Sequence, residues 1–290
     1  MSNTGLIIEQ RSRDIGDFLV GRYLPFRKKR MVGPFIFIDH MGPSSIGSEN
    51  YLDVGQHPHI GLSTLTYLFE GQIHHRDSIG SDKVITPGSV NWMTAGKGVA
   101  HTERTPVAMR DGNTYPLHGF QIWVALPKDL EQMEPEFHHF DKDQLPHWEE
   151  DGLKYRLVAG EAFGIKAPVP VYSPLFMIEI KSEKDTKLDL QNQVKGEIGI
   201  CIIKGSINAC GQVIEAGNMV VSKTEDACHV EVSDQTHLLL FGGEPFSDKR
   251  HIYWNFVSSS IDTIEQAKTD WKNKAFPKVL GDDSYIKMPE

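Results

Sequence analysis

The chain has 290 residues, of which 39% are hydrophobic and 24% charged, a composition that fits a folded globular protein and excludes a disordered one. Its formal net charge of −9 disfavours direct nucleic-acid binding, because proteins that hold phosphates usually present a basic face. No apolar run is long enough to span a bilayer, and the first five residues do not resemble a signal peptide, so no membrane partner is expected.

Two short features give weaker indications. The basic run at residues 27–30 is interpreted as a solvated loop or strand edge, with a targeting or phosphate-binding patch as the alternative. The three cysteines, Cys201, Cys210 and Cys228, are odd in number and form no Cys-x-x-Cys pair. They favour a reduced setting inside the cell. We therefore expect a cytoplasmic protein, with the nucleus as an additional location in a eukaryote.

The first half of the chain is predicted to consist of short β-strands. The segment 64–69 is rich in β-branched and aromatic residues and ends at Glu70-Gly71. Pro87-Gly88 marks a turn, because proline fixes φ and glycine tolerates positive φ. The predicted strands cover residues 64–69, 72–75, 83–86, 89–93 and 120–126. This pattern predicts an all-β domain.

The second half repeats this pattern in a weaker form. Residues 198–207 match the segment that ends at Ile73, and residues 213–220 match residues 84–90. We interpret this as an internal duplication of one β-barrel unit. The irregular, polar stretch around residues 129–150 separates the copies, so we predict domains at residues 1–137 and 138–290. Near the end, residues 261–274 are predicted to form a short helix capped by Asp262 or Thr263.

Two histidine-containing motifs in the first copy predict a metal site. His57-Pro58-His59 and His101-Thr102-Glu103 each place two donor groups at spacing i, i+2. Alternate side chains of a strand share one face, so two neighbouring strands would aim four donors at one point. Three imidazoles and a carboxylate suit Fe, Mn, Ni, Cu or Zn better than Ca or Mg.

Each motif has a plainer interpretation as well. One His-x-His pair often occurs without binding anything, and it is the combination of both pairs that favours a site. The glycine-rich Gly96-Lys97-Gly98 is interpreted as a tight bend before His101, and a phosphate cradle is the weaker alternative because no helix clearly follows. The other histidines considered are interpreted as solvated or structural, and they are His40, His74, His75, His118, His138 and His139.

The second copy serves as an internal control. Counting from the matched glycines places Gln191 and Gln193 at the positions of His57 and His59. It places Val230 and Val232 at those of His101 and Glu103, with His229 one residue out of phase. The second copy is therefore predicted to lack metal ligands.

The motifs taken together resemble those of the pirin family of the cupin superfamily. The resemblance rests on His57-Pro58-His59-Ile60-Gly61, on residues 67–71 and 92–98, on His101-Thr102-Glu103, and on residues 241–245 and 254–259. It implies two face-to-face cupin barrels, with one mononuclear iron in the N-terminal barrel held by His57, His59, His101 and Glu103. Fe(II) is the metal implied, with Mn, Ni, Cu, Co or Zn as substitutes. The family often has arginine where this chain has Ile60, which affects the expected substrate-binding details.

The same resemblance implies two alternative functions. The first is a quercetin 2,3-dioxygenase type of activity, in which O₂ opens a flavonol ring at the metal, carbon monoxide is released and Glu103 acts as general base. The second is a redox-responsive protein without enzymatic activity that binds transcription factors or metabolic enzymes. A cupin isomerase or small-molecule binder is the third possibility.

Overall fold

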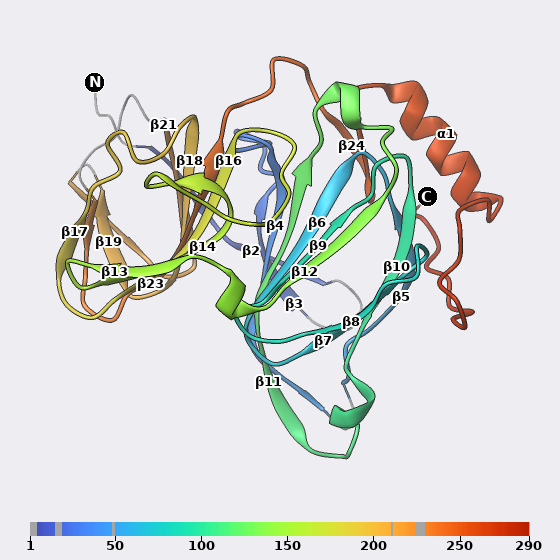
Figure 1. The fold of residues 1–290 in the computed structure, drawn as a ribbon, viewed down its shortest axis with the longest axis horizontal. Coiled ribbons are helices and arrows are strands. Elements are labelled where there is room, and N and C mark those ends of the chain that lie inside the picture. Colours follow the sequence, from blue (N-terminus) through green and yellow to red (C-terminus); the bar gives the residue numbers. More distant parts are fainter. Residues whose placement is uncertain (1–4, 15–18, 48–49, 210, 224–229, 290) are drawn as a thin grey trace. The chain divides into compact units, whose positions relative to one another are not determined.

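The computed structural model describes residues 5–14, 19–47, 50–209, 211–223 and 230–289 (Figure 1). Its described part consists mainly of strands and short loops, with a single α-helix, α1 (Ile261–Lys272), so the all-β prediction is confirmed. The chain forms two compact units. The histidine unit comprises Ser12–Gly21, Phe37–Lys142 and Ser247–Glu290, and the second unit comprises Met1–Arg11, Arg22–Ile36 and Asp143–Phe246.

Two antiparallel sheets build the histidine unit. The smaller has the order β5 (Asp53–His59), β10 (Val99–Arg104), β7 (Ile73–Asp77), β8 (Asp82–Ile85). The larger has the order β12 (Glu136–Phe140), β9 (Val90–Thr94), β6 (Leu62–Glu70), β11 (Thr114–Ala125), β4 (Phe35–Gly47), β3 (Leu19–Leu24), β2 (Arg11–Asp14). The hairpin β24 (His251–Tyr253) and β25 (Phe256–Ser258) precedes α1, and two 3₁₀ turns, η1 (Val107–Met109) and η2 (Lys128–Leu130), flank β11.

The second unit repeats this plan. Its larger sheet has the order β1 (Leu6–Glu9), β21 (Asn218–Lys223), β18 (Glu197–Lys204), β23 (His237–Gly243), β16 (Leu175–Ser182), β14 (Leu153–Ala162), β13 (His147–Glu150), with β15 (Ile165–Lys166) beside β14. Its four-stranded sheet has the order β17 (Thr186–Leu188), β22 (Val230–Val232), β19 (Ser206–Ala209), β20 (Gln212–Glu215), and the turn η3 (Lys142–Gln144) precedes β13.

The predicted duplication appears in the turns as well as in the sheets. Gly71 lies between β6 and β7 with φ +83°, and Gly205 lies between β18 and β19 with φ +77°. Gly88 and Gly217 occupy the next matching turn with φ +79° and +81°. Only glycine adopts this conformation without steric cost, so these turns preserve the same local geometry in both copies.

One detail of the predicted alignment is wrong. The strand register pairs Val230 with Leu188, in the way that it pairs His101 with His57. Leu188, not Gln191, therefore stands in the place of His57, because the connection from this strand to the next is longer in the second copy. Counting residues across a loop cannot detect such an insertion.

The predicted strands agree closely with the observed ones, and the helix begins at Ile261 as predicted but differs in its last residue and in its cap. It ends at Lys272, and its N-cap is Ser260, whose Oγ accepts a hydrogen bond from the Thr263 backbone N–H at 3.4 Å. The cap predicted at Asp262 or Thr263 is therefore wrong. The division predicted after residue 137 falls within β12 and stays a prediction about the domains. Cys201 is buried and has no disulfide, while Cys210 and Cys228 lie outside the described residues.

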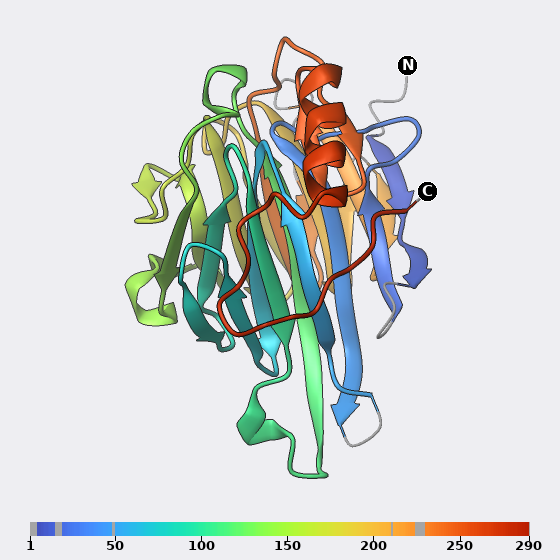
Figure 2. The same ribbon diagram turned by 90° about the vertical axis from the view of Figure 1, so that its right-hand side faces the viewer.

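The four-stranded sheet of the histidine unit has two differently occupied faces. Its outer face carries Ile60 and Ala100, which pack with Ile264, Ala267 and Trp271 of α1. Figure 2 shows the helix and the chain beyond it crossing this face. Ile60 is 2% exposed there, so it is a packing residue and not part of a site entrance. No helix among the described residues is long and apolar enough to cross a membrane.

Candidate metal centre

Three of the four predicted ligands meet on the inner face of the four-stranded sheet. Strands β5 and β10 are antiparallel, and their register pairs His57 with His101 and His59 with Val99. The ligand atoms of His57, His59 and His101 all lie within 4.8 Å of one another. His57, His59 and His101 are buried, with 7%, 1% and 1% of their surface exposed, respectively. The i, i+2 spacing has therefore produced the expected convergence.

Burial keeps these three rings neutral. Loss of solvent lowers the pKa of His57 to about 4 and lowers the pKa values of His59 and His101 well below their usual range. Nδ1 of His57 lies 2.9 Å from the backbone oxygen of Gly55, so it carries the proton and leaves Nε2 with a lone pair. Nε2 of His59 and Nε2 of His101 are buried and have no hydrogen-bond partner among the described residues.

This arrangement fits a transition-metal ion. A buried polar atom without a partner is costly, and neutral imidazole nitrogens that face one another without donors would repel. A divalent cation would satisfy all three nitrogens, and neutral imidazole is the form that binds metals.

Glu103, the fourth predicted ligand, is brought to the same region by β10. Its carboxylate groups with His101 and His75, with ligand atoms again within 4.8 Å of one another. Its Oε1 accepts a hydrogen bond from Thr66 Oγ1 at 3.1 Å. The residue keeps part of its surface accessible, yet its carboxyl group lies among buried side chains, and this desolvation raises its pKa. A carboxylate of raised pKa is a stronger base than an exposed one.

Sequence reasoning missed the part played by His75 and Asp77. The register between β10 and β7 pairs His101 with Asp77 and Glu103 with His75, so all four side chains lie on the inner face. His75 Nδ1 lies 3.3 Å from His101 Nδ1, and His75 Nε2 lies 3.1 Å from Asp77 Oδ2. His75-Arg76-Asp77 is itself a third i, i+2 pair, and this was the signal available in the sequence.

The contacts from Asp77 through His75 to His101 determine which ring nitrogen of each histidine carries the proton. Asp77 accepts from the backbone N–H groups of Ile79 and Ser81 at 3.1 and 2.8 Å, which holds its carboxylate in place. A carboxylate only accepts, so His75 donates from Nε2 and presents a lone pair at Nδ1. His101 then donates from its Nδ1, and its Nε2 is left as an electron-pair donor. The carboxylate–histidine support of a metal ligand is a common way to set its tautomer.

The other histidines considered in the sequence occupy ordinary structural positions. His74 bonds Asp82 at 2.6 Å at the surface, and His138 lies 3.0 Å from Glu136. His139 Nδ1 contacts the Asn91 side chain at 2.7 Å. His40 and His118 contact each other through their Nε2 atoms at 2.9 Å.

The glycine-rich loop before His101 is a bend. The backbone N–H of Lys97 donates to Met133 O at 2.9 Å, and that of Gly98 donates to Ala95 O at 2.9 Å. Gly96 O accepts from Gly61 N at 2.8 Å. The N–H groups that a phosphate cradle would need are bonded within the protein, so the bend interpretation is supported.

The matching position of the second unit carries apolar side chains. Val230 pairs with Ala209 and Val232 with Ile207, and both valines and Ile207 are buried. Their counterparts in the histidine unit are the pairs of His101 with Asp77 and of Glu103 with His75. His229 lies outside the described residues.

Comparisons with known proteins agree with this architecture. Residues 17–124 match the family model described as Pirin, and residues 175–277 match the one described as Pirin C-terminal cupin domain. A pirin-like protein of Caulobacter vibrioides is 48% identical over 98% of this chain and 99% of its own length. Human pirin is 32% identical over 75% of each chain.

A solved structure extends the likeness to three dimensions. The crystal structure of a quercetin 2,3-dioxygenase from Acinetobacter baumannii has a TM-score of 0.90 and 36% identity, covering 99% of this chain and 95% of that one. The two family matches, the whole-length relative and this structure lead to one conclusion. The chain is a member of the pirin family with two cupin domains.

Proposed function

We propose that this protein binds one divalent metal ion, most favourably Fe(II), through His57, His59, His101 and Glu103, and that it cleaves flavonols with O₂. The observation that carries the proposal is the set of three buried, neutral imidazoles, in which Nε2 of His59 and Nε2 of His101 have no hydrogen-bond partner among the described residues. The 36% identity to a structure described as a quercetin 2,3-dioxygenase supports the reaction type. Mn, Ni, Cu, Co and Zn suit the same donors, so iron is proposed as the favoured ion rather than the exclusive one.

A metal bound by four protein ligands would leave a position for the substrate's 3-hydroxyl group and lower that group's pKa. Glu103 would accept the hydroxyl proton as general base, since its carboxylate lies in the same group as His101 and His75. Thr66, which donates to Glu103 Oε1, would hold this carboxylate in place and leave its other oxygen for the proton. The histidine cluster and its surroundings would exclude bulk water from the deprotonated, electron-rich flavonol before it reacts with O₂.

Aromatic side chains near the cluster would hold a flat substrate. Trp123 lies 5.1 Å from the His59 ring, measured between centroids, and Phe37 stacks on Trp123 at 4.0 Å. Both residues retain a small exposed surface of 6% and 8%. Offset stacking on such rings is the usual way to orient a planar aromatic ligand. We propose that they contact the flavonol rings.

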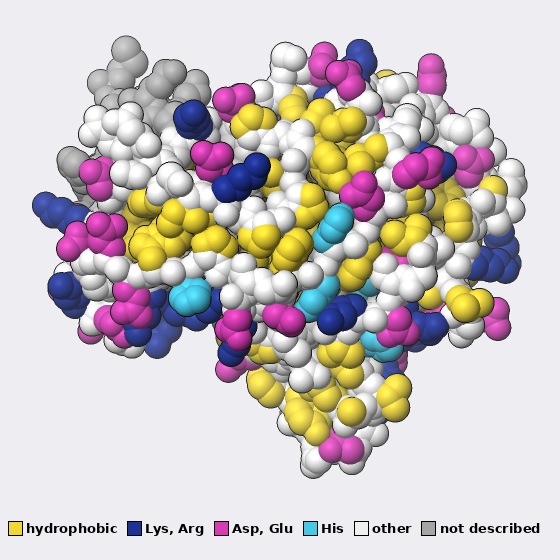
Figure 3. All heavy atoms as spheres, in the orientation of Figure 1, with side chains coloured by type: hydrophobic (Ala, Val, Ile, Leu, Met, Phe, Trp, Pro, Cys, Tyr) yellow, Lys and Arg dark blue, Asp and Glu magenta, His cyan; other side chains and the backbone are white. Residues whose placement is uncertain are grey.

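We propose a small-molecule substrate together with O₂, and no direct nucleic-acid or membrane partner. The net charge of −9 opposes binding to phosphates. On the face drawn in Figure 3, Lys and Arg side chains are interspersed with Asp and Glu, and hydrophobic patches separate them. A cytoplasmic location remains part of the proposal.

The test is anaerobic purification, loading with Fe(II), and measurement of O₂ uptake and carbon monoxide release with quercetin. We expect turnover well above that of free Fe(II) at the same concentration. His101→Ala should lose both bound iron and turnover. His101 belongs both to the group with His57 and His59 and to the group with His75 and Glu103. The matched control is His138→Ala, a partly exposed histidine of β12, which should retain both.

Iron-replete protein that gives no turnover above free metal would contradict the enzymatic proposal. His101→Ala that keeps full iron occupancy would contradict the ligand assignment. A protein that binds iron stoichiometrically without turnover would favour the alternative function, a redox-responsive interaction protein. The acidic net charge would suit a basic protein partner in that case.

A further inference from the structure

Strand β5, which carries two of the three clustered histidines, is irregular just before them. It lies at the edge of its sheet, in the order β5-β10-β7-β8. His101 pairs with His57, but Glu103 pairs with Val54, so Gly55 and Gln56 together oppose Thr102. This is a β-bulge, which redirects neighbouring side chains and takes backbone groups out of the ladder. Something other than the sheet must therefore hold residues 55 and 56.

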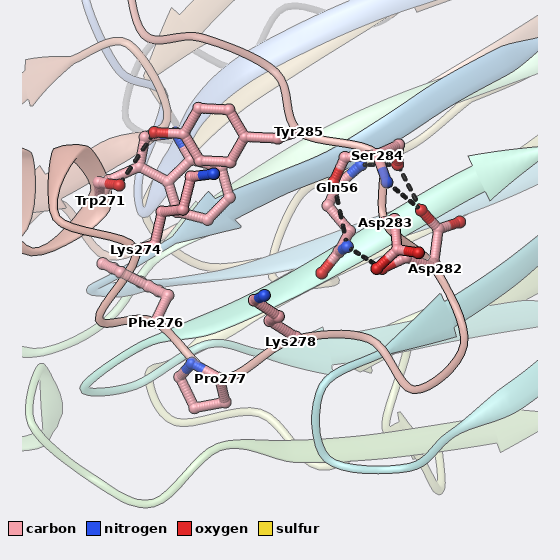
Figure 4. Close-up of a pocket in the computed structure, with 10 residues that line it drawn as sticks. All are labelled: Gln56, Trp271, Lys274, Phe276, Pro277, Lys278, Asp282, Asp283, Ser284 and Tyr285. Atoms are coloured by element: carbon pink, nitrogen blue, oxygen red, sulfur yellow. Dashed lines mark hydrogen bonds between the residues drawn. The ribbon is translucent and has the colours of Figure 1, made fainter.

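The C-terminal segment (residues 276–289) provides that support through Gln56. The Gln56 backbone N–H donates to Ser284 Oγ at 2.9 Å, and its backbone oxygen accepts from Ile286 N at 2.9 Å. Its side-chain Nε2 donates to the backbone oxygens of Asp282 and Ser284 at 2.6 and 3.0 Å. Its Oε1 accepts from Val279 N at 2.8 Å. Figure 4 shows Gln56 facing Asp282 and Ser284 in this way.

Every polar group of Gln56 is thus bonded to one distant segment. The residue is 4% exposed, so these hydrogen bonds are made away from water, where an unmade bond is costly. Gly55 fits the same contact, because a Cβ there would lie 3.0 Å from Ser284 Oγ.

The C-terminal segment is itself anchored at several other points. Arg104 of β10 bonds Asp282 at 2.9 Å, and Arg76 of β7 donates to Leu280 O at 2.5 Å. Trp271 of α1 donates from Nε1 to Ile286 O at 3.0 Å. The segment therefore spans β5, β10 and β7 and is fixed to the helix, as its path across the sheet in Figure 2 shows.

We infer that Gln56 is a positioning residue, through which the C-terminal segment fixes the bulge and holds His57 and His59 in the geometry that binds metal. His57 follows Gln56 directly, and its proton is held by Gly55 O, the other residue of the bulge. Movement of the bulge would displace both the His57 backbone and the acceptor that sets its tautomer. This inference rests on the metal site proposed above.

The experiment uses the full-length protein loaded anaerobically with Co(II) alone, whose visible absorption reports ligand geometry. Gln56→Ala and Ser284→Ala are compared with Gln266→Ala, an exposed glutamine of α1 that bonds only Asp270 in the described contacts. We expect Gln56→Ala to alter the cobalt spectrum and to release cobalt to a chelator roughly 10–100 times faster. Ser284→Ala should shift both readouts in the same direction to a smaller extent, and Gln266→Ala should match wild type.

A second readout uses the metal-free protein. Backbone amides of residues 54–59 should exchange with deuterium faster in Gln56→Ala than in wild type or Gln266→Ala. Unchanged exchange, or a cobalt spectrum and release rate equal to wild type in both variants, would overturn the inference. Wild-type protein that takes up no cobalt would contradict the proposed metal site, and the exchange measurement would then decide the positioning role separately. Ser284→Ala keeps the inference testable if Gln56→Ala fails to fold.

Discussion

In two of the three clustered histidines, the nitrogen that faces the cluster is determined by what the other ring nitrogen contacts. In His57 the partner is Gly55 O, a backbone atom of the same strand. In His101 the partner is His75, which in turn contacts Asp77. The short-range contact in His57 and the chain of His101, His75 and Asp77 thus have the same effect. Each leaves an imidazole nitrogen whose lone pair can bind a metal.

Asp77→Asn tests this chain of tautomers. An amide in place of the carboxylate would use its oxygen for the two backbone N–H groups and present N–H to His75, which reverses the proton positions of His75 and His101. His101 would then carry a proton on Nε2. We expect metal affinity to fall roughly 10–100-fold while the fold is retained. Titration with Co(II) and circular dichroism measure the two effects.

The matched control is Asp82→Asn on the neighbouring strand β8. Asp82 also accepts from a histidine, His74, at 2.6 Å, but this pair lies at the surface. Its loss should leave metal affinity unchanged. Equal affinities in Asp77→Asn and wild type would show that the tautomer of His101 is not held by this chain.

The sequence reveals the main donors and not their supporting residues. His57, His59 and His101 follow from strand alternation alone, since each motif contains its own i, i+2 pair. His75 adjoins His74, so strand alternation sends only one of the two inward, and the sequence alone does not say which. Its role depends on the register of β7 against β10, which no local pattern states.

Among the secondary-structure elements, the turn that ends β5 is tightly constrained. Gly61 has φ +68°, and a Cβ there would lie 2.0 Å from Val257 O. Its backbone also bonds Gly96 and Leu126. This turn joins β5 to β6 two residues after His59, so it has little freedom to adjust.

Gly61→Ala should therefore be costly. The variant adds a steric clash with backbone to the strain of positive φ, and we expect a loss of about 3–4 kcal/mol in the free energy of unfolding. Gly80→Ala is the control, because Gly80 has φ +97° but nothing within 4 Å of its Cβ position. It should lose only about 1–2 kcal/mol. Equal losses in urea denaturation would contradict the packing argument.

The start of α1 shows why element boundaries escape sequence reasoning. Five residues around the start of α1 have side chains of the kind that cap helices: Ser258, Ser259, Ser260, Asp262 and Thr263. Ser258 and Ser259 instead bond Glu131, a residue more than a hundred positions earlier, with Ser258 Oγ donating at 2.7 Å. Ser260 is left for the cap. A distant carboxylate thus engages two of the adjacent candidates, and no local pattern reveals this.

At the scale of the whole molecule, one chain carries two cupin domains of different character. The duplication itself could be predicted, because glycine turns and strand composition recur in both halves. The exact equivalence of β17 and β5 could not, because loop length is free to vary at the surface. In the second unit a continuous apolar core, including Leu188, Val230 and Val232, fills the space between the sheets.

Acid stability is a further property of the whole chain, and Glu179 of the second unit contributes to it. Burial would raise its pKa, but contacts with His237 and Lys181, at 2.9 and 2.8 Å, outweigh this and lower the pKa to about 2. Burial lowers the pKa of His237, and the hydrogen bond to Glu179 opposes that shift.

A folded-state pKa below the unfolded value stabilises the protein above the unfolded pKa, near 4.5, and this contribution disappears as pH falls toward 2. Glu179→Gln should thus lower stability at pH 7 by up to about 3 kcal/mol, and its difference from wild type should shrink between pH 4.5 and 2. Urea denaturation across this range, with exposed Glu161→Gln as control, measures it. A difference that does not vary with pH would contradict the assignment.

The C-terminal segment also has a consequence for association between molecules. An edge strand with free backbone groups is a template for strands of other chains, and proteins often cover such edges. The hydrogen bonds of Gln56 to Ser284 and Ile286 occupy backbone groups of β5 that its bulge leaves unpaired. The segment that supports the histidines therefore also covers this strand edge and opposes edge-to-edge aggregation. Displacing it would expose backbone N–H and C=O groups of β5, beside the histidine cluster, to pairing with strands of other molecules.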